Sequence, residues 1–266
     1  MKKLALVLFG LGMFGITAGR AAVTQAAPAL NAKTSAVDKA KITLPAPKEI
    51  ITRYVAAIGG RDSILKHSSH HSIGAFEMAA QGLKGNLEVF ASKPNKILVK
   101  IDLPDLGKMQ QGYNGVVGWS IDPLIGPMLL KGKQLLQTRD QAEFYYVLHD
   151  EKDFQKMETV EIAEFQGKRC YKLKVIRKSG DESTEFFDVE SGLLIGTIST
   201  QETPLGSMAV TSTLSNYKTF GGILTPTRLT QKVAGIEQIM TIQKVEYDNV
   251  PETTFAMPKE IQTLSE

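Results

Sequence analysis

Apolar residues recur at every second position through most of the chain after residue 67. This is the pattern of β-strands that bury one face. Strands of this kind are predicted over residues 76–80, 87–91, 97–103, 159–164, 169–177, 184–189, 193–201, 208–217, 224–233 and 236–247. The breaks between them are short and rich in Gly, Pro, Asn and Asp, as at Gln81-Gly82 and Ser191-Gly192. Such connections are typical of an antiparallel meander.

The apolar spacing is helical in two other places. Ile51, Tyr54, Val55 and Ile58 fall on one stripe of a helix that Pro47 can open, and Gly59-Gly60 ends it before a short turn carrying Ile64 and Leu65. The second place is residues 132–149, where one or two helices are predicted. The fold class is therefore mainly β with α cover: a large antiparallel twisted sheet forming an incomplete barrel. Such a sheet must protect its edges, and the helices are the candidate lid.

The first 26 residues have the pattern of a secretory signal peptide. Lys2 and Lys3 precede an apolar run over residues 4–16, followed by small residues, and the cleavage site falls between Ala21 and Ala26. The run is shorter than the roughly 20 residues that span a bilayer, and no longer one follows, so the mature chain is expected to have no transmembrane segment. Residues 27–46 predict a flexible N-terminal tether, and residues 47–266 a single half-barrel domain.

Removal of the predicted leader also changes the charge. Lysine plus arginine falls from 31 to 28, which equals the 28 acidic residues. A neutral chain without a basic stripe is a poor partner for nucleic acid or an anionic membrane surface. The single Cys170 forms no intramolecular disulfide and is expected to be a buried or half-buried structural thiol. We expect an exported, soluble protein, periplasmic if the organism has an outer membrane.

Four segments resemble the LolA/LolB-like family, which includes exported outer-membrane lipoprotein-sorting proteins. They are ITRYVAAIGG at residues 51–60, GNLEVFASKPNK at 85–96, QGYNGVVGW at 111–119 and FFDVESGLL at 186–194. The resemblance runs from about residue 47 to residue 258. It implies an incomplete β-barrel whose helices act as a lid over an apolar cavity for the acyl chains of a lipoprotein or another lipid.

The candidate cavity lining consists of apolar residues on predicted strands or on the covering segments. These residues are Met78, Leu87, Val89, Val99, Trp119, Leu130, Phe144 and Leu148. The same side chains would also fill a plain core. The apolar segment of residues 123–130 is bracketed by Pro and Gly, which disfavour a strand, so it is predicted as a loop belonging either to the lid or to a self-packed surface loop.

Three hypotheses of function remain. The first is a non-enzymatic carrier that binds a lipid or lipoprotein acyl chain, and the second is an envelope module with a filled half-barrel that docks a protein partner. The third, a metal-dependent hydrolase, would use His67, His70 and His71, although successive strand residues face opposite ways and an exposed polar turn is the preferred interpretation of this segment. No catalytic or nucleotide-binding motif is present, so no cofactor is expected.

Overall fold

The computed structural model describes residues 43–104, 106–204 and 206–264. Its thirteen strands form one antiparallel sheet in the order β6-β5-β4-β3-β2-β1-β13-β12-β11-β10-β9-β8-β7. The strands are β1 Ser69–Met78, β2 Leu83–Ser92, β3 Lys96–Leu103, β4 Gly107–Tyr113, β5 Gly118–Asp122, β6 Gly126–Leu129, β7 Phe154–Phe165, β8 Lys168–Arg177, β9 Glu182–Asp188, β10 Leu194–Thr203, β11 Gly206–Phe220, β12 Ile223–Val233 and β13 Ile236–Tyr247. The predicted mainly β fold with helical cover is confirmed. The predicted signal peptide and all of the predicted tether except residues 43–46 lie outside the described residues.

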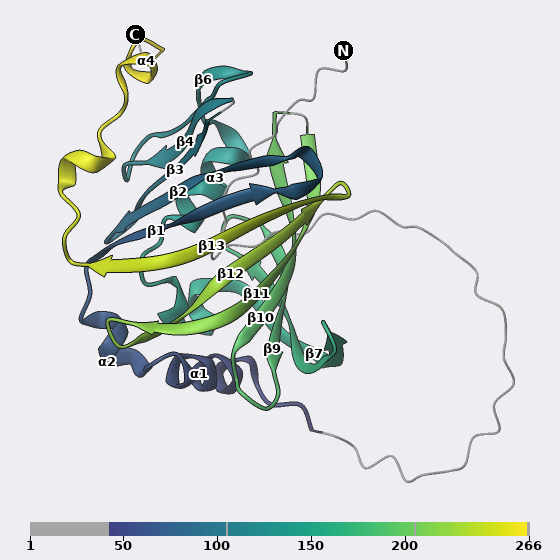
Figure 1. Ribbon diagram of the computed structural model, residues 1–266. Helices are drawn as coiled ribbons and strands as arrows, with labels where there is room; N and C mark the ends of the chain where they lie inside the picture. Colours follow the sequence, from purple (N-terminus) through teal and green to yellow (C-terminus); the bar gives the residue numbers. More distant parts are fainter. Residues whose placement is uncertain (1–42, 105, 205, 265–266) are drawn as a thin grey trace, which may run out of the picture.

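Short helices cover the concave side and one end of this curved sheet (Figure 1). The α-helices are α1 Pro47–Ala57, α2 Gly60–Leu65, α3 Gly132–Gln141 and α4 Lys259–Gln262, and the 3-10 helices are η1 Ala79–Gln81, η2 Tyr146–Leu148, η3 Glu151–Asp153 and η4 Glu252–Phe255. Within the described ranges, no helix is both long and apolar enough to cross a bilayer. The helices predicted from Pro47 and over residues 132–149 are therefore present, the second as α3 followed by η2.

The junction between α1 and α2 is fixed against the turn that connects β11 to β12. Gly59 has φ +124°, and a Cβ at this position would lie 2.3 Å from the carbonyl oxygen of Gly222. The backbone N–H of Leu224 also donates to the carbonyl oxygen of Ile58 over 2.8 Å. Only glycine combines this backbone angle with so close an approach. The two helices are thus held across the end of the sheet (Figure 1).

The concave face holds the main core, and it is not uniformly apolar. Alternate residues of the central strands bury side chains such as Leu87, Ile101 and Met240, as the predicted alternation requires. A polar row also crosses five neighbouring strands in register, and each member is at least nine-tenths buried. Its members are Glu185, Thr197, Ser212, Gln231 and Gln238. This row separates the main core from a small apolar cluster around Val210 and Val233.

The outer face of β3, β5 and β6 carries a second apolar cluster. Trp119 is completely buried there, together with Leu98, Phe255 and Ile261. The last two come from η4 and α4, in the C-terminal segment that runs back over this side of the sheet (Figure 1). The indole lies over Gly112, where a Cβ would approach it to 2.3 Å. The C-terminal segment therefore provides the cover that this end of the sheet needs.

Three sequence-based expectations about the structure are wrong. Residues 126–129 form edge strand β6 rather than part of a loop, and Pro127 pairs with Ile121 at the edge of the sheet. Proline is tolerated there because an edge strand can leave one row of N–H positions unpaired. The segment containing the histidines is not an exposed turn, since His67 is 6% exposed and His70 and His71 lie in β1. The sheet also has thirteen strands where the pattern predicts about ten.

Candidate ligand-binding site

A cavity of about 150 Å³ lies between the concave face of the sheet and the helices that cover it. Its walls come from α1, α2, the segment after α3, and strands β1, β2, β3, β12 and β13. The lining residues are Tyr54, Ile58, Ile64, His67, His70, Ser72, Val89, Ala91, Ile97, Gln141, Ala142, Glu143, Phe144, Tyr146, Val147, Ile223, Leu224, Thr225, Pro226, Val245 and Tyr247. Most are alkyl or aromatic, so the cavity favours an apolar occupant.

The helical wall follows from the apolar stripe of α1. Tyr54 and Ile58 are spaced one helical turn apart, and both are 4% exposed. The ring of Tyr54 meets that of Phe187 edge-to-face with 5.4 Å between centroids, which fixes α1 against β9. Burial raises the pKa of the Tyr54 hydroxyl, and the neighbouring charge of Glu185 raises it further, so Tyr54 remains neutral.

The strand wall comes from alternate residues of β1, β2 and β3. Val89 and Ala91 are spaced two residues apart on β2 and therefore face the same side. His70, which pairs with Ala91, is the polar member of this wall, and its Nδ1 lies 3.2 Å from the hydroxyl of Ser72. Burial, and then the neighbouring His71, lower the pKa of His70 to about 4, so the imidazole is neutral at physiological pH. The strand wall thus offers no charge to a bound molecule.

His67 connects three segments at the edge of the cavity. Its Nδ1 lies 2.7 Å from Oδ2 of Asp248, its Nε2 lies 2.8 Å from the carbonyl oxygen of Gly221, and its ring stacks on Tyr247 at 3.9 Å. Partial desolvation raises the pKa of Asp248, but hydrogen bonds from His67 and Ser68 outweigh this effect and hold that pKa at about 2. Both ring nitrogens of His67 make these contacts, so His67 holds the three segments together and has a structural role.

The segment from Phe144 to Val147 forms the remaining wall and is held by a buried polar group. The hydroxyl of Tyr146 donates to Oε1 of Glu185 over 3.5 Å, and the guanidinium of Arg177 lies 4.4 Å from the centre of the Tyr146 ring. Burial raises the pKa of Glu185 to about 7, although Arg177 opposes this effect. The wall is therefore attached to the sheet through an acid that titrates near neutral pH.

A second cavity of about 180 Å³ lies on the other side of η2. Its apolar lining comes from Ile51, Val55, Leu148 and Met157, and charged side chains including Lys48 and Glu151 also line it. Val147 lines both cavities, so η2 is the partition between them.

Comparison with known proteins was informative at the level of structure alone. No protein-family model and no curated protein matches the sequence. A LolA superfamily protein from Nitrosomonas europaea has a TM-score of 0.54 and 12% identity, with 80% of this chain and 99% of that chain covered. The chain has a LolA-like fold. A DUF1329 family protein from Desulfovibrio piger has a TM-score of 0.51 and 14% identity, with 79% of this chain and 96% of that chain covered. The predicted resemblance is thus confirmed for the fold, while the ligand must be argued from the site.

The residues predicted to line a cavity are distributed over several parts of this LolA-like fold. Val89 and Phe144 line the 150 Å³ cavity, and Leu148 lines the second one. Met78, Leu87 and Val99 belong to the main core beneath it. Leu130 lines a separate polar pocket, and Trp119 lies in the outer cluster, away from both cavities.

Sequence reasoning missed several cavity residues that carried a usable signal. Tyr54 and Ile58 lie on the predicted helical stripe, and Ala91 and Ile97 lie on the same predicted strand faces as Val89 and Val99. The pattern places these residues on their elements but does not distinguish them as cavity residues. The contributions of β12 and β13 carried no such signal, because their place beside β1 depends on the order of the strands in the sheet.

Neither His71 nor Cys170 lines the apolar cavity. His71 faces away from the cavity, where Nε2 lies 2.9 Å from Oε1 of Glu88. Cys170 is fully buried, its thiol donates to the carbonyl oxygen of Lys168, and burial raises its pKa. In the part of the chain that the structure describes, no three His, Cys, Asp or Glu side chains are grouped so as to hold a metal ion.

Proposed function

We propose that this protein binds the acyl chain of a lipid or lipoprotein in the cavity beneath α1 and acts as a non-enzymatic carrier in the cell envelope. The observation that carries the proposal is the 150 Å³ space, lined mainly by alkyl and aromatic groups, inside a LolA-like fold. A location outside the cytoplasm is supported by the signal-peptide pattern of residues 1–26. No bond is made or broken in this function.

The size of the cavity sets the expected strength of binding. A cavity of about 150 Å³ holds a group the size of benzene, which corresponds to about six carbon atoms. Each methylene removed from water contributes about 0.8 kcal/mol, so six contribute about 5 kcal/mol before the costs of association are subtracted. A longer chain requires the second cavity as well, which lies beyond Val147. Affinity should therefore rise with chain length.

Native mass spectrometry tests this proposal directly. The protein is purified from its own host, weighed intact, and then extracted under denaturing conditions to identify any acyl lipid that was bound. Fluorescent fatty acids of six to sixteen carbons provide the second measurement, and saturable binding of one molecule that strengthens with chain length is expected. An intact mass without lipid, together with no saturable uptake of any fatty acid, would overturn the proposal.

An envelope interaction module is the second candidate, and the open sheet edges favour it. Among the described residues, β6 and β7 each pair with a single strand, so each offers one edge to a strand from another protein. However, β7 carries charged side chains at Lys156, Glu158 and Glu161, and charges on an edge strand disfavour such pairing. The carrier function is therefore the better supported of the two. A protein without bound lipid that captures an envelope protein through β6 would reverse this order.

A further inference from the structure

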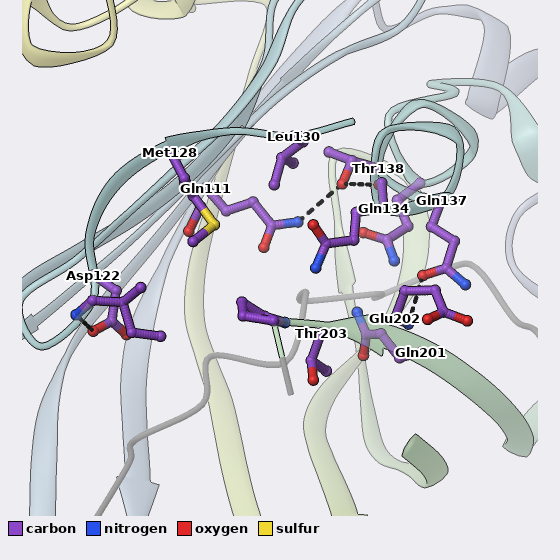
Figure 2. A pocket seen from close by; sticks show the side chains of 14 residues that line it. Gln111, Asp122, Met128, Leu130, Gln134, Gln137, Thr138, Gln201, Glu202 and Thr203 are labelled. Carbon is purple, nitrogen blue, oxygen red and sulfur yellow. Dashed lines mark hydrogen bonds between the residues drawn. The ribbon is translucent and has the colours of Figure 1, made fainter. Parts of the chain in front are cut away.

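A polar pocket of about 40 Å³ lies beside α3 (Figure 2). α3 contacts β4 and β5 near one end of the strand order and β10 near the other end, so it bridges two distant parts of the sheet. Five glutamines from three parts of the chain line the pocket: Gln111, Gln134, Gln137, Gln141 and Gln201. An amide group both donates and accepts hydrogen bonds, so the wall suits a partner that does the same.

The framework holds part of this wall in place. Nε2 of Gln111 donates to the hydroxyl of Thr138 over 3.2 Å, and Oε1 of Gln137 accepts from the backbone N–H of Glu202 over 3.0 Å, as Figure 2 shows. The carboxylate of Glu202 is paired with Lys133 at 2.9 Å and accepts from the hydroxyl of Ser207. The charge of Glu202 is therefore already compensated within the protein.

Asp122 supplies an independent observation that points to a ligand. It lines the pocket from the end of β5 and is 5% exposed. Its Oδ1 accepts the backbone N–H groups of Leu124 and Ile125, over 2.7 and 3.1 Å. Its Oδ2 is buried and has no hydrogen-bond partner among the described residues. A buried acceptor in this state is costly, and a donor placed in the pocket would relieve the cost.

We propose that this pocket binds an uncharged group rich in hydroxyls, such as one edge of a sugar or a glycerol unit. Its lining contains no Lys or Arg among the described residues, so an anion would meet the carboxylate of Asp122 with no lining cation to balance the charge. An alkyl chain would leave Oδ2 of Asp122 buried without a donor. A hydroxyl donates to Asp122 and also exchanges hydrogen bonds with the glutamines. A pocket of 40 Å³ has room for about three water-sized groups, which matches the hydroxyls along one edge of such a unit.

The pocket is adjacent to the apolar cavity. Gln141 lines both spaces, and the in-register row Val89, Val99, Gln111 and Ser120 runs from the apolar lining to the polar one. Neighbouring strands lie about 4.8 Å apart, so Val89 and Gln111 are separated by roughly 10 Å. The hydroxyl group has two possible sources, a free sugar or the head group of a neutral glycolipid. The head-group source rests on the proposed function, because it requires the acyl chain to occupy the apolar cavity.

Two probes and two kinds of variant distinguish these sources. Glucose and octyl glucoside, the latter below its micelle concentration, are titrated into the full protein while amide resonances around Asp122 are followed by NMR. Asp122→Asn keeps an acceptor for the turn but presents N–H₂ where Oδ2 lies, and Gln134→Leu removes one amide from α3. Each should weaken binding of the sugar about tenfold. Gln110→Leu, on the opposite face of β4, is the matched control and should bind as the wild type does.

Ala91→Phe, which fills the apolar cavity, separates the outcomes. A free-sugar site binds glucose and is insensitive to Ala91→Phe, whereas a head-group site binds octyl glucoside far better and is weakened by both Asp122→Asn and Ala91→Phe. In a third outcome, Ala91→Phe weakens binding of octyl glucoside, whereas Asp122→Asn and Gln134→Leu leave it unchanged. This result overturns the polar pocket and keeps the carrier function. If Asp122→Asn and Gln134→Leu weaken binding of octyl glucoside and Ala91→Phe does not, the polar pocket is confirmed as the sugar site. The acyl chain then does not occupy the apolar cavity. If neither probe shifts these resonances, the pocket holds water only and the proposal is wrong.

Discussion

Filling the apolar cavity with a side chain should abolish acyl binding and leave the fold intact. Ala91 is 7% exposed and lines the cavity from near the end of β2. Ala91→Phe adds a phenyl ring, and a ring of this size occupies a cavity of about 150 Å³ almost completely. The ring would replace the part of the acyl chain that the cavity now accommodates.

The expected loss follows from that replacement. About six methylenes lose their site at about 0.8 kcal/mol each, or about 5 kcal/mol in total. This free energy corresponds to an increase of roughly three orders of magnitude in Kd. The melting temperature should stay the same or rise, because the ring adds apolar contacts within the cavity, whereas overpacking would cost about 1–3 kcal/mol.

The assay is a titration with a fluorescent sixteen-carbon fatty acid, with thermal unfolding of the same samples. Ala80→Phe is the matched control, since Ala80 is exposed in η1 and the same ring there should leave Kd unchanged. Ile97→Phe provides a second way to reduce the cavity from β3. If folded Ala91→Phe and Ile97→Phe both bind the fatty acid like the wild type, the acyl chain does not occupy this cavity and the reasoning fails.

Three further predictions concern stability. The pKa of Glu185 is raised to about 7. The stability that its protonated form contributes is therefore present below about pH 4.5 and is lost as pH rises through 7. Glu185→Gln should remove up to about 3 kcal/mol of this pH dependence, measured by urea unfolding at pH 5 and pH 8. The pKa of Asp248 is lowered to about 2, so its contribution to stability is present above about pH 4 and is lost as pH falls through 2. Asp248→Asn should reduce the fall in melting temperature over this acid range. An unchanged fall would mean that the contact with His67 contributes nothing. Trp119→Ala should lower the free energy of unfolding by about 3–5 kcal/mol without changing Kd for fatty acid, and a change in Kd would contradict its place in the outer cluster.

Most strands and the two longest helices were determined locally and could be predicted. Leu87, Val89 and Ala91 alternate with polar neighbours, and this period of two specifies a strand with one buried face whatever lies opposite it. The helical stripe of residues 47–58 is local in the same way. β6 was missed because Pro127 argues against a strand, and only the position at the edge of the sheet makes that proline acceptable.

The site itself was only partly predictable. Val89 and Phe144 were expected to line a cavity, and they do. Trp119 has the same apolar character but lies on the outer face, because it shares a row with Leu98 and Gly112 that the C-terminal segment covers. A sequence pattern tells which residues share a face but not which face of the sheet a distant segment will cover.

The sequence by itself determined which residues alternate, where the turns fall and which segments are helical, because these depend on neighbours within a few positions. Only the tertiary structure decided that the main core leaves a cavity beside Ala91, and that Gln111, Gln137 and Gln201 meet around one pocket. Those residues are far apart in the chain. Their distances depend on the curvature of a thirteen-stranded sheet and on how α1 and α3 pack against it, and packing is a property of the whole fold.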